Sequence, residues 1–566
     1  MTDRRTFVGA TAGLVAGLAG GAPSLSILVR PGRRRVSADL LLRGALVYDG
    51  SGSPPVQADV AVAGDRIEAV SRSLDAPGAQ VLDLTDLALA PGFIDIHSHT
   101  DLGLAVDPSA ASKIRQGVTT EVTGQDGDSI GPWREDEARA TRERYASRYG
   151  VDFDFADLGG FFRWLVRNPP GINLASMVGA GSVRGYVIGN DDRRATAEEL
   201  DRMVALVANA LRDGACGVSS GLEYVPSAFA DLAELVALSR PLQGTGLPYA
   251  SHMRNEDDRV VAAVEEALNV GRLAGVPVQI SHLKAQGQRN WWKAEPILHL
   301  LEAARGEGID VMYDRYPYVA FSTGLSNLFP IWARDGGTDR FLERLDDSEV
   351  APRIEEAVRA KIAQLGSWDA VQVTSTSAPE LAWAEGQRLG ALAQARGMEP
   401  YALLLQLVRG DRARSGMVGF GMSEENTTRF LAHPLGMVCS DGSALSADGP
   451  LSEGTPHPRN FGTFPRVLGH YVREQRAMPL ETAIHKMTGM SARRLRLEGR
   501  GTITPGAFAD LVAFDPDTVA DRATFANPHQ YPVGIPHVMV NGQFVVRDGE
   551  STGVRSGRVV RPGVRV

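Results

Sequence analysis

Residues 91–99 read Pro91-Gly-Phe-Ile-Asp-Ile-His97-Ser-His99, a short apolar run that ends in two histidines. This pattern is typical of a buried strand that delivers side chains to its carboxyl end. His97 and His99 are two residues apart, so on an extended strand their imidazoles point to the same side. Two imidazoles on one side are suited to binding a metal ion. The segment therefore predicts a strand followed by a metal site.

Helix-like and strand-like segments alternate further along the chain. Thr196-Ala-Glu-Glu199 is a capping box and begins a helix with one apolar face. The alternation continues as strand 216–220, helix 260–270, strand 276–280, helix 294–304 and strand 309–313. Such alternation predicts parallel βαβ units, and a barrel of eight needs ~250 residues, fewer than lie between 90 and 500. We therefore predict an α/β fold with a (β/α)₈ TIM-like barrel.

Both chain ends contain short strand-like runs separated by turn residues, over 38–89 and 501–546. We expect these runs to pair into one small β-sandwich domain. The predicted organisation is a signal or disordered N-terminus at 1–37, the first part of the β domain at 38–90, the barrel at 91–500 and the second part of the β domain at 501–566. An insertion at about 325–435 exceeds a minimal barrel and contains helical stretches at 350–365 and 399–408.

The composition is that of an ordinary globular protein. The 566 residues carry 59 Lys and Arg against 68 Asp and Glu, a formal charge of −9, with 43% hydrophobic residues, which excludes collagen, coiled coil and wholesale disorder. The acidic balance without a basic stripe argues against nucleic-acid binding. Two cysteines, Cys216 and Cys439, are too few for a disulfide scaffold or a Cys-rich zinc module. Only five of the basic residues are lysines: Lys113, Lys284, Lys293, Lys361 and Lys486.

The N-terminal segment has the pattern of a signal peptide. Arg4-Arg5 precedes a short apolar stretch over 7–21, and small residues follow near Ala22. The Arg-Arg-x-Phe core resembles a twin-arginine signal, although Asp3 stands where Ser or Thr is usual. We expect export to the periplasm, with a cytoplasmic location as the alternative. The apolar stretch is too short and Gly-rich for a stable membrane span, and nothing later in the sequence reads as one.

Further metal-ligating residues follow other strand-like runs. His252 ends the run at 249–252, His282 ends the run at 279–282, and Asp441 ends the run at 437–441. Because the carboxyl ends of parallel barrel strands meet at one mouth, we expect these residues to lie near His97 and His99. Histidines and a carboxylate gathered at one mouth are typical of a metal site.

At these residues the sequence resembles the amidohydrolase superfamily, and within it the N-acyl-D-amino-acid deacylases, or D-aminoacylases. Residues 91–99 resemble the first-strand signature, and residues 116–124 are similar to the second-strand segment. The other matching motifs are Gly221-Leu-Glu-Tyr224, Ser251-His-Met-Arg254, Ser281-His-Leu-Lys284, Asp314-Arg-Tyr-Pro-Tyr318 and His457-Pro-Arg-Asn-Phe-Gly-Thr-Phe464. The resemblance covers roughly 38–548. It implies a (β/α)₈ barrel beside a small β domain built from both chain ends, with the insertion as a lid.

The resemblance also implies a zinc cofactor, with one tight site and room for a second, weaker one. Asp126, His252 and His282 are the candidates for the tight site, and His97, His99 and Asp441 surround the weaker one. Asp126 stands where the family has a cysteine. A carboxylate also binds zinc but is a harder ligand, so the metal preference stays open. No lysine lies between 114 and 283, which excludes a carboxylated lysine on the fourth strand.

These residues predict a metal-dependent hydrolase. A metal ion lowers the pKa of a coordinated water, and Asp441 is the predicted general base that takes its proton and passes it to the leaving amine. By resemblance, the α-carboxylate of the substrate is held by Lys284, Tyr316 and Arg459, and Tyr224 and Ser322 lie close by.

The predicted reaction is hydrolysis of the amide bond in small-molecule N-acyl-D-amino acids, which gives a carboxylate and a free D-amino acid. Two alternatives remain. One is an amidohydrolase that acts on another C–N bond, such as a cyclic amide in the manner of a dihydroorotase or hydantoinase, or a dipeptide. The other is a non-catalytic amidohydrolase-like scaffold. The sequence carries no signal for an oligomeric state.

Overall fold

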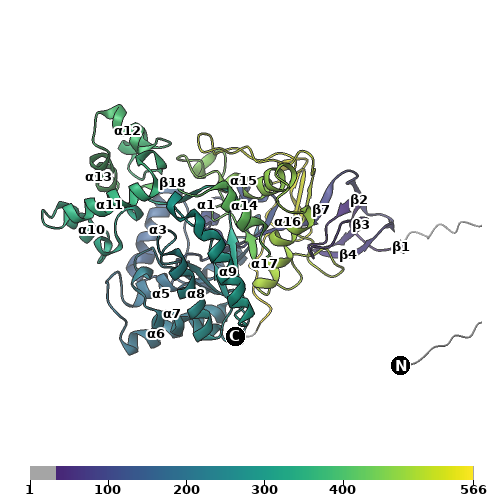
Figure 1. The fold of residues 1–566 in the computed structure, drawn as a ribbon. Coiled ribbons are helices and arrows are strands. Elements are labelled where there is room, and N and C mark those ends of the chain that lie inside the picture. Colours follow the sequence, from purple (N-terminus) through teal and green to yellow (C-terminus); the bar gives the residue numbers. More distant parts are fainter. Residues whose placement is uncertain (1–33, 565–566) are drawn as a thin grey trace, which may run out of the picture.

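The computed structural model describes residues 34–564 and has a mixed α/β fold, as predicted. The segment expected to be a signal lies almost entirely outside these residues. In Figure 1 the strands from both chain ends lie on the right, helices surround the centre, and the inserted helices α10 to α13 project on the left. No helix within residues 34–564 is long and apolar enough to cross a membrane.

Parallel strands run through the centre of the molecule in sequence order. They are β8 (Phe93–Asp95), β9 (Val118–Thr123), β10 (Asn173–Ser176), β11 (Val178–Gly179), β12 (Val218–Gly221), β13 (Tyr249–His252), β14 (Val278–Ile280), β15 (Val311–Arg315) and β19 (Gly436–Val438). Each pairs with the next, except that β10 and β11 are consecutive pieces separated by Met177. Just beyond β8 and β19, Ser98 and Gly442 form a parallel bridge, so the segment after the last strand lies beside the segment after the first.

Helices cover the outside of these strands, and they include the helices predicted to begin at Thr196 and to lie over 260–270 and 294–304. They include α4 (Leu158–Arg167), α5 (Ala180–Val187), α6 (Ala197–Asp213), α7 (Leu232–Ser239), α8 (Val260–Ala274), α9 (Ala294–Gly306), α14 (Glu424–Ala432), α16 (Leu480–Met487) and α17 (Gly489–Arg494). The capping box of Thr196 and Glu199 begins α6, and Gly214 ends it in the left-handed conformation. Every residue of β9, β12, β13, β14 and β19 is buried, as expected for strands enclosed on both faces.

Strands from the two chain ends pair into one sheet. Its members are β2 (Leu40–Val47), β3 (Val56–Ala63), β4 (Arg66–Ser71), β6 (Gln80–Asp83), β7 (Ala88–Pro91), β20 (Leu511–Phe514), β21 (His537–Val540), β22 (Gln543–Arg547) and β23 (Glu550–Ser551). The antiparallel pair β7–β20 joins the N-terminal strands to the C-terminal ones. The pairings follow a single path, with β6 as a side branch on β2, so the predicted two-sheet sandwich is not confirmed. Because β7 leads directly into β8, this sheet anchors the segment that carries His97.

The insertion has its own sheet and core. β16 (Ala320–Gly324) and β17 (Val371–Ser375) both pair antiparallel with β18 (Gly416–Phe420). Around this sheet lie α10 (Gly337–Asp346), α11 (Ala351–Leu365), α12 (Leu389–Arg396) and α13 (Pro400–Gly410), with a separate apolar cluster that includes Phe341, Ile354 and Leu404. The inserted sheet begins at Ala320, and α14 packs against β15 and β19. The insertion is therefore displaced towards the N-terminus relative to 325–435.

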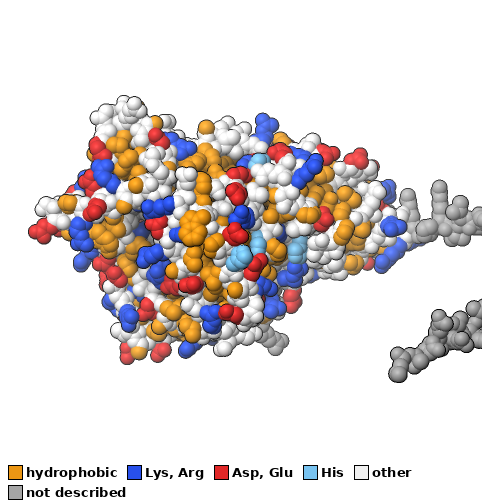
Figure 2. Space-filling model, in the orientation of Figure 1, with side chains coloured by type: hydrophobic (Ala, Val, Ile, Leu, Met, Phe, Trp, Pro, Cys, Tyr) orange, Lys and Arg blue, Asp and Glu red, His pale blue; other side chains and the backbone are white. Residues whose placement is uncertain are grey.

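On the face drawn in Figure 2, acidic and basic side chains are interspersed among hydrophobic ones. This mixed surface agrees with the small net charge of the chain.

Candidate active site

A cavity of about 640 Å³ opens where the parallel strands end. All of the residues that the sequence singled out line this cavity, except His97 and Tyr316. These two side chains are fully buried beneath it. The fold therefore brings together in one place residues that are more than 300 positions apart in the chain, because the carboxyl ends of the strands converge.

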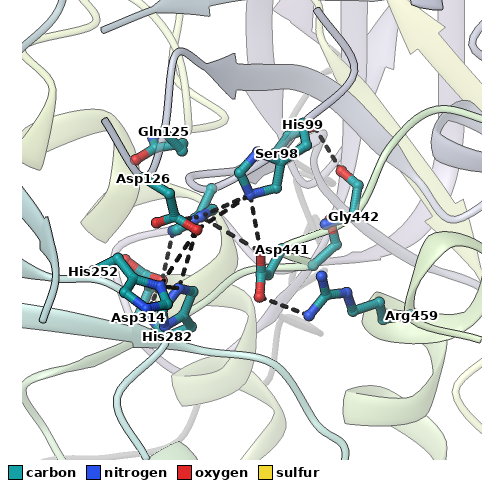
Figure 3. A network of polar contacts seen from close by, with 12 residues as sticks. Ser98, His99, Gln125, Asp126, His252, His282, Asp314, Asp441, Gly442 and Arg459 are labelled. Atoms are coloured by element: carbon teal, nitrogen blue, oxygen red, sulfur yellow. Dashed lines mark hydrogen bonds and ion pairs between the residues drawn. The ribbon is translucent and has the colours of Figure 1, made fainter. Parts of the chain in front are cut away.

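Asp126, His252 and His282 form one compact group (Figure 3). They follow β9, end β13 and follow β14, respectively. His252 Nδ1 lies 3.0 Å from His282 Nε2, and Asp126 Oδ2 lies 3.3 Å from His282 Nε2 and 3.6 Å from His252 Nδ1. One possible ligand atom from each thus lies within 4.8 Å of the others, so the structure brings together the three residues predicted for a tight metal site.

His97, His99 and Asp441 form a second group, and Asp126 belongs to it too. His99 Nε2 lies 3.3 Å from His97 Nε2 and 3.0 Å from Asp441 Oδ1. Asp126 Oδ1 lies 3.4 Å from His97 Nε2, and Asp126 Oδ2 lies 3.5 Å from His99 Nε2. The sequence analysis assigned Asp126 to the tight site alone, whereas the structure places its carboxylate between both groups.

The donor set fits a cation such as zinc. Imidazole nitrogen and carboxylate oxygen are ordinary zinc ligands. Within residues 34–564, the buried Asp126 Oδ1 has no hydrogen-bond partner. A buried carboxylate oxygen without a donor is costly, and a bound cation satisfies it.

The backbone around these residues is unusual. Asp126, His282 and Asp441 have φ values of 53°, 35° and 52°, in the left-handed region that side chains other than glycine rarely adopt. Such conformations cluster at functional sites, where the surroundings hold them. Close packing is part of those surroundings: a Cβ on Gly124 would lie 2.0 Å from the carbonyl oxygen of Met177, and one on Gly221 would lie 1.9 Å from that of Asp126.

The carboxylates of the site favour positive charge on His97 and His99. Burial lowers the pKa of His97, but Asp126 and Asp314 outweigh it and raise the pKa well above its usual value. For His99, Asp126 and Asp441 overcome burial in the same way and raise the pKa to about 9. Burial raises the pKa of Asp126, but His282 and His97 hold it well below its usual range. The carboxylates thus hold protons on His97 and His99, and a metal cation would replace those protons.

Three carboxylates that the sequence analysis did not assign lie behind His97, His252 and His282. Asp314 Oδ1 lies 3.4 Å from His97 Nδ1, and Glu256 Oε1 lies 3.1 Å from His282 Nδ1. Glu223 Oε2 lies 3.7 Å from His252 Nε2. Each faces the ring nitrogen that points away from the ligand cluster, which is how carboxylates orient metal-bound histidines. Glu223 and Asp314 belong to motifs quoted in the sequence analysis, which gave neither residue a role of its own.

The cations expected to bind substrate are also paired within the protein. Lys284 Nζ lies 2.6 Å from Glu256 Oε1 and 2.6 Å from His282 Nδ1. Arg459 Nη1 donates to Asp441 Oδ2 at 2.6 Å (Figure 3). The ring of Tyr316 lies between them, with its centre 5.1 Å from the Arg459 guanidinium and 5.7 Å from Lys284 Nζ.

Hydroxyl groups complete this side of the cavity. Thr323 Oγ1 donates to Tyr224 Oη at 3.4 Å, and Ser322 precedes it on β16. The Tyr316 hydroxyl has no hydrogen-bond partner in the part of the chain that the structure describes. Cations and hydroxyls therefore lie together beside the ligand cluster.

Strand ends that gather four histidines and two aspartates around one cavity place this chain among the metal-dependent amidohydrolases. Comparison with known proteins agrees with this class. The Amidohydrolase family pattern matches residues 427–546. A D-aminoacylase from Alcaligenes xylosoxydans xylosoxydans is 39% identical over 522 residues, 92% of this chain and 97% of that protein.

Solved structures show the same similarity. One solved structure is that of a D-aminoacylase, studied for the functional role of its binuclear metal centre. It superposes with a TM-score of 0.77 at 38% identity and covers 93% of this chain and all of that one. An N-acyl-D-glutamate deacylase from Bordetella bronchiseptica, complexed with zinc and a phosphonate inhibitor, superposes with a TM-score of 0.78 at 34% identity and covers the same share of each chain. The chain therefore belongs to the D-aminoacylase family of N-acyl-D-amino-acid deacylases.

Proposed function

We propose that this chain is a zinc-dependent hydrolase that cleaves the amide bond of N-acyl-D-amino acids. The observation that carries the proposal is the placement of Asp441. One oxygen of this carboxylate faces the ligand histidines, 3.0 Å from His99 Nε2, and the other is held by Arg459. A carboxylate between a metal site and a cation can move a proton beside a bound substrate.

Asp126, His252 and His282 would hold the tighter zinc, and His97, His99, Asp126 and Asp441 would surround a second, weaker position. When bound, zinc polarises a carbonyl oxygen and lowers the pKa of a coordinated water. The binuclear centre of one relative and the zinc in another support this assignment. The three carboxylates behind His97, His252 and His282 would fix the orientation of the rings.

The remaining chemistry falls to this chain's own residues. Asp441 takes a proton from the attacking water at Oδ1 and later gives it to the nitrogen of the leaving amine. Arg459 holds Oδ2 of the same carboxylate, so the proton is received on the oxygen that faces His99. Burial raises the pKa of Asp441, but Arg459 and His282 keep it well below its usual range, so the group is ionised at the start of the cycle.

The substrate carboxylate is proposed to bind on the side of the cavity formed by Lys284, Tyr316, Arg459, Tyr224 and Ser322. Two cations and three hydroxyls suit a carboxylate by charge and by hydrogen bonding. The Tyr316 hydroxyl, which has no hydrogen-bond partner among residues 34–564, supports a direct role in holding it.

We also infer that the parallel strands close as a (β/α)₈ barrel, and the bridge between Ser98 and Gly442 supports this closure. The insertion is proposed to cover the barrel mouth. In support, Phe321, Asn327, Lys361 and Met417 of the insertion line the same cavity as His99 and Asp441.

The test is hydrolysis of paired N-acetyl-D- and N-acetyl-L-amino acids by the zinc-loaded protein. We expect turnover of the D-substrates and, in Asp441→Asn, loss of at least about 100-fold in kcat with the tight metal retained. Turnover of hydantoins or dipeptides in place of N-acyl-D-amino acids would support another C–N bond as the target. Tight zinc binding without turnover of any of these amides would support the scaffold alternative.

Export through a twin-arginine signal is a separate proposal. A fusion of residues 1–37 to a reporter should reach the periplasm, and Arg4→Lys with Arg5→Lys should retain it in the cytoplasm. Reporter activity in the two cell fractions measures this directly. Equal export of both fusions would contradict the proposal.

A further inference from the structure

We propose that Lys113 is a positioning residue that fixes the segment of Asp441 against the segment of His97 and His99 from beneath the cavity. The inference rests on the proposed function, because it assigns those side chains a catalytic or metal-binding role. Lys113 lies on α2 (Ala111–Ile114), outside the cavity, and its side chain is fully buried.

The Lys113 ammonium bonds to the residues immediately before and after Asp441 in the chain. Its Nζ lies 2.7 Å from Ser440 Oγ and 3.0 Å from the carbonyl oxygen of Gly442. Asp441 itself has the left-handed φ of 52° and donates its backbone N–H to the carbonyl oxygen of His97 at 2.9 Å. The residues before and after this strained position are thus both tied to one buried cation.

The same ammonium bonds to two carboxylates that hold the neighbouring strands. Lys113 Nζ lies 2.6 Å from Asp95 Oδ2, and Asp95 Oδ1 accepts from the Ser440 backbone N–H at 2.8 Å. On its other side Nζ lies 3.0 Å from Glu121 Oε1. Asp95 belongs to β8 and Glu121 to β9, so the ammonium links both strands to the segment after β19.

Glu121 extends the network to the His97–His99 segment. Its Oε1 accepts from Ser98 Oγ at 3.0 Å and from Thr100 Oγ1 at 2.9 Å. Ser98 lies between the two histidines, and Thr100 follows the second. Every residue adjacent to His99 or Asp441 is therefore held by a group that itself contacts Lys113.

The direct contacts of Lys113 lie beside the second ligand group. The partners of Lys113 lie on β8, on β9, between His97 and His99, and after β19, whereas His252 ends β13 and His282 follows β14. Loss of Lys113 should therefore weaken the second metal position and turnover, and leave the tight site in place. A general loss of structure would affect both sites together.

The chemistry of the network makes the lysine hard to replace. An ammonium donates to several oxygens arranged around it, and here it is enclosed by Asp95, Glu121, Ser440 and Gly442. Removing it leaves two buried carboxylates without a cation, which is strongly destabilising locally. Methionine fills a similar volume but donates no hydrogen bond.

The experiment compares wild type with Lys113→Met, Ser440→Ala and Lys486→Met, each as the full chain. Lys486 is the matched control, because it is also a buried lysine but, within residues 34–564, bonds only to the backbone carbonyls of His433 and Gly436 at the other end of β19. Zinc titration of metal-free protein gives the affinity of each site, and steady-state kinetics gives kcat and KM separately.

For Lys113→Met we expect the second metal affinity and kcat to fall by about 10-fold or more, while the tight-site affinity stays within about threefold. Lys486→Met should leave both affinities and kcat within about threefold. Retention of the second metal and of kcat in a folded Lys113→Met would overturn the proposal, as would equal loss at both sites.

Ser440→Ala keeps the test decisive if Lys113→Met does not fold. It removes one hydroxyl shared by Asp95 and Lys113, and it should lower the second metal affinity by about threefold, with the tight site unchanged. An unchanged second site in this variant would overturn the role of the network. If wild type binds both metals but cleaves no N-acyl-D-amino acid, the proposed function fails while the metal titrations still test Lys113.

Discussion

Arg459 Nη1 lies 2.6 Å from Asp441 Oδ2, so the cation expected to bind the substrate carboxylate is already paired with the carboxylate expected to move the proton. Both side chains are almost fully buried. Arg459 can therefore affect both substrate binding and proton transfer, since it faces the cavity and also fixes the orientation of Asp441.

The first prediction is that Arg459→Met raises KM and lowers kcat. Removing one partner of a buried charge pair costs about 2 to 5 kcal/mol, because the other charge is left unpaired. Arg459→Lys should lose less, since it keeps the charge but not the planar fork. Steady-state kinetics on an N-acetyl-D-amino acid separates the two effects. An unchanged KM in Arg459→Met would remove this residue from substrate binding.

The second prediction is that His252→Ala and His282→Ala each lose the tight metal and lower kcat/KM by more than about 100-fold. Each removes a ligand from the same group of three. His299→Ala is the control, because His299 lies on α9 with 70% of its side chain exposed, away from the cavity. Metal analysis of the purified variants checks the outcome. A variant that kept both its zinc and its rate would show that the remaining residues suffice to hold the metal.

Local pattern was enough to predict that most of the candidate metal-binding side chains lie together. The spacing of His97 and His99, and the positions of His252, His282 and Asp441 at the ends of apolar runs, depend only on strand periodicity and on the convergence of parallel strand ends. The capping box at Thr196 likewise begins α6 as predicted. Features that depend on a few neighbouring residues can be predicted from the sequence, because the geometry of the backbone fixes them.

The partners behind the cluster could not be predicted, because they depend on which strands become neighbours. Asp314 comes from β15 and contacts His97, which follows β8. Lys284 and Arg459 were predicted as substrate cations, and only the packed structure reveals their pairing with Glu256 and Asp441. The single sheet from the chain ends likewise depends on the pairing of β7 with β20, which no local signal specifies.

The third prediction concerns Asp126, which lies between both ligand groups. Asp126→Ala should weaken both metal sites, because its Oδ2 faces His282 and its Oδ1 faces His97. Asp126→Cys should raise the preference for zinc over manganese, since a thiolate is a softer ligand. Asp128→Ala is the control: Asp128 lines the same cavity but accepts a hydrogen bond from Ser182 at 2.9 Å.

Titration of the three variants with zinc, cobalt and manganese measures this effect. If zinc affinity in Asp126→Ala equals that of wild type, the histidines alone hold the metal and Asp126 is only a turn residue. Weakening of one site alone would show that the carboxylate does not bridge the two groups.

The fourth prediction is a pH dependence of stability that originates at Lys486. Its Nζ donates to the carbonyl oxygens of His433 and Gly436, the residue is 2% exposed, and burial lowers its pKa from 10.5 to about 7. Between these pH values the unfolded chain binds more protons at this position than the folded protein does, so this lysine makes stability rise with pH. Below the lower value both states are protonated, and the contribution to the slope vanishes.

Urea unfolding of wild type and Lys486→Met from about pH 7.5 to 9.5 measures this effect. The free energy of unfolding of the wild type should rise, relative to that of the variant, by up to about 1.4 kcal/mol per pH unit. A difference that stays constant or shrinks as pH rises would mean that the buried lysine keeps its charge.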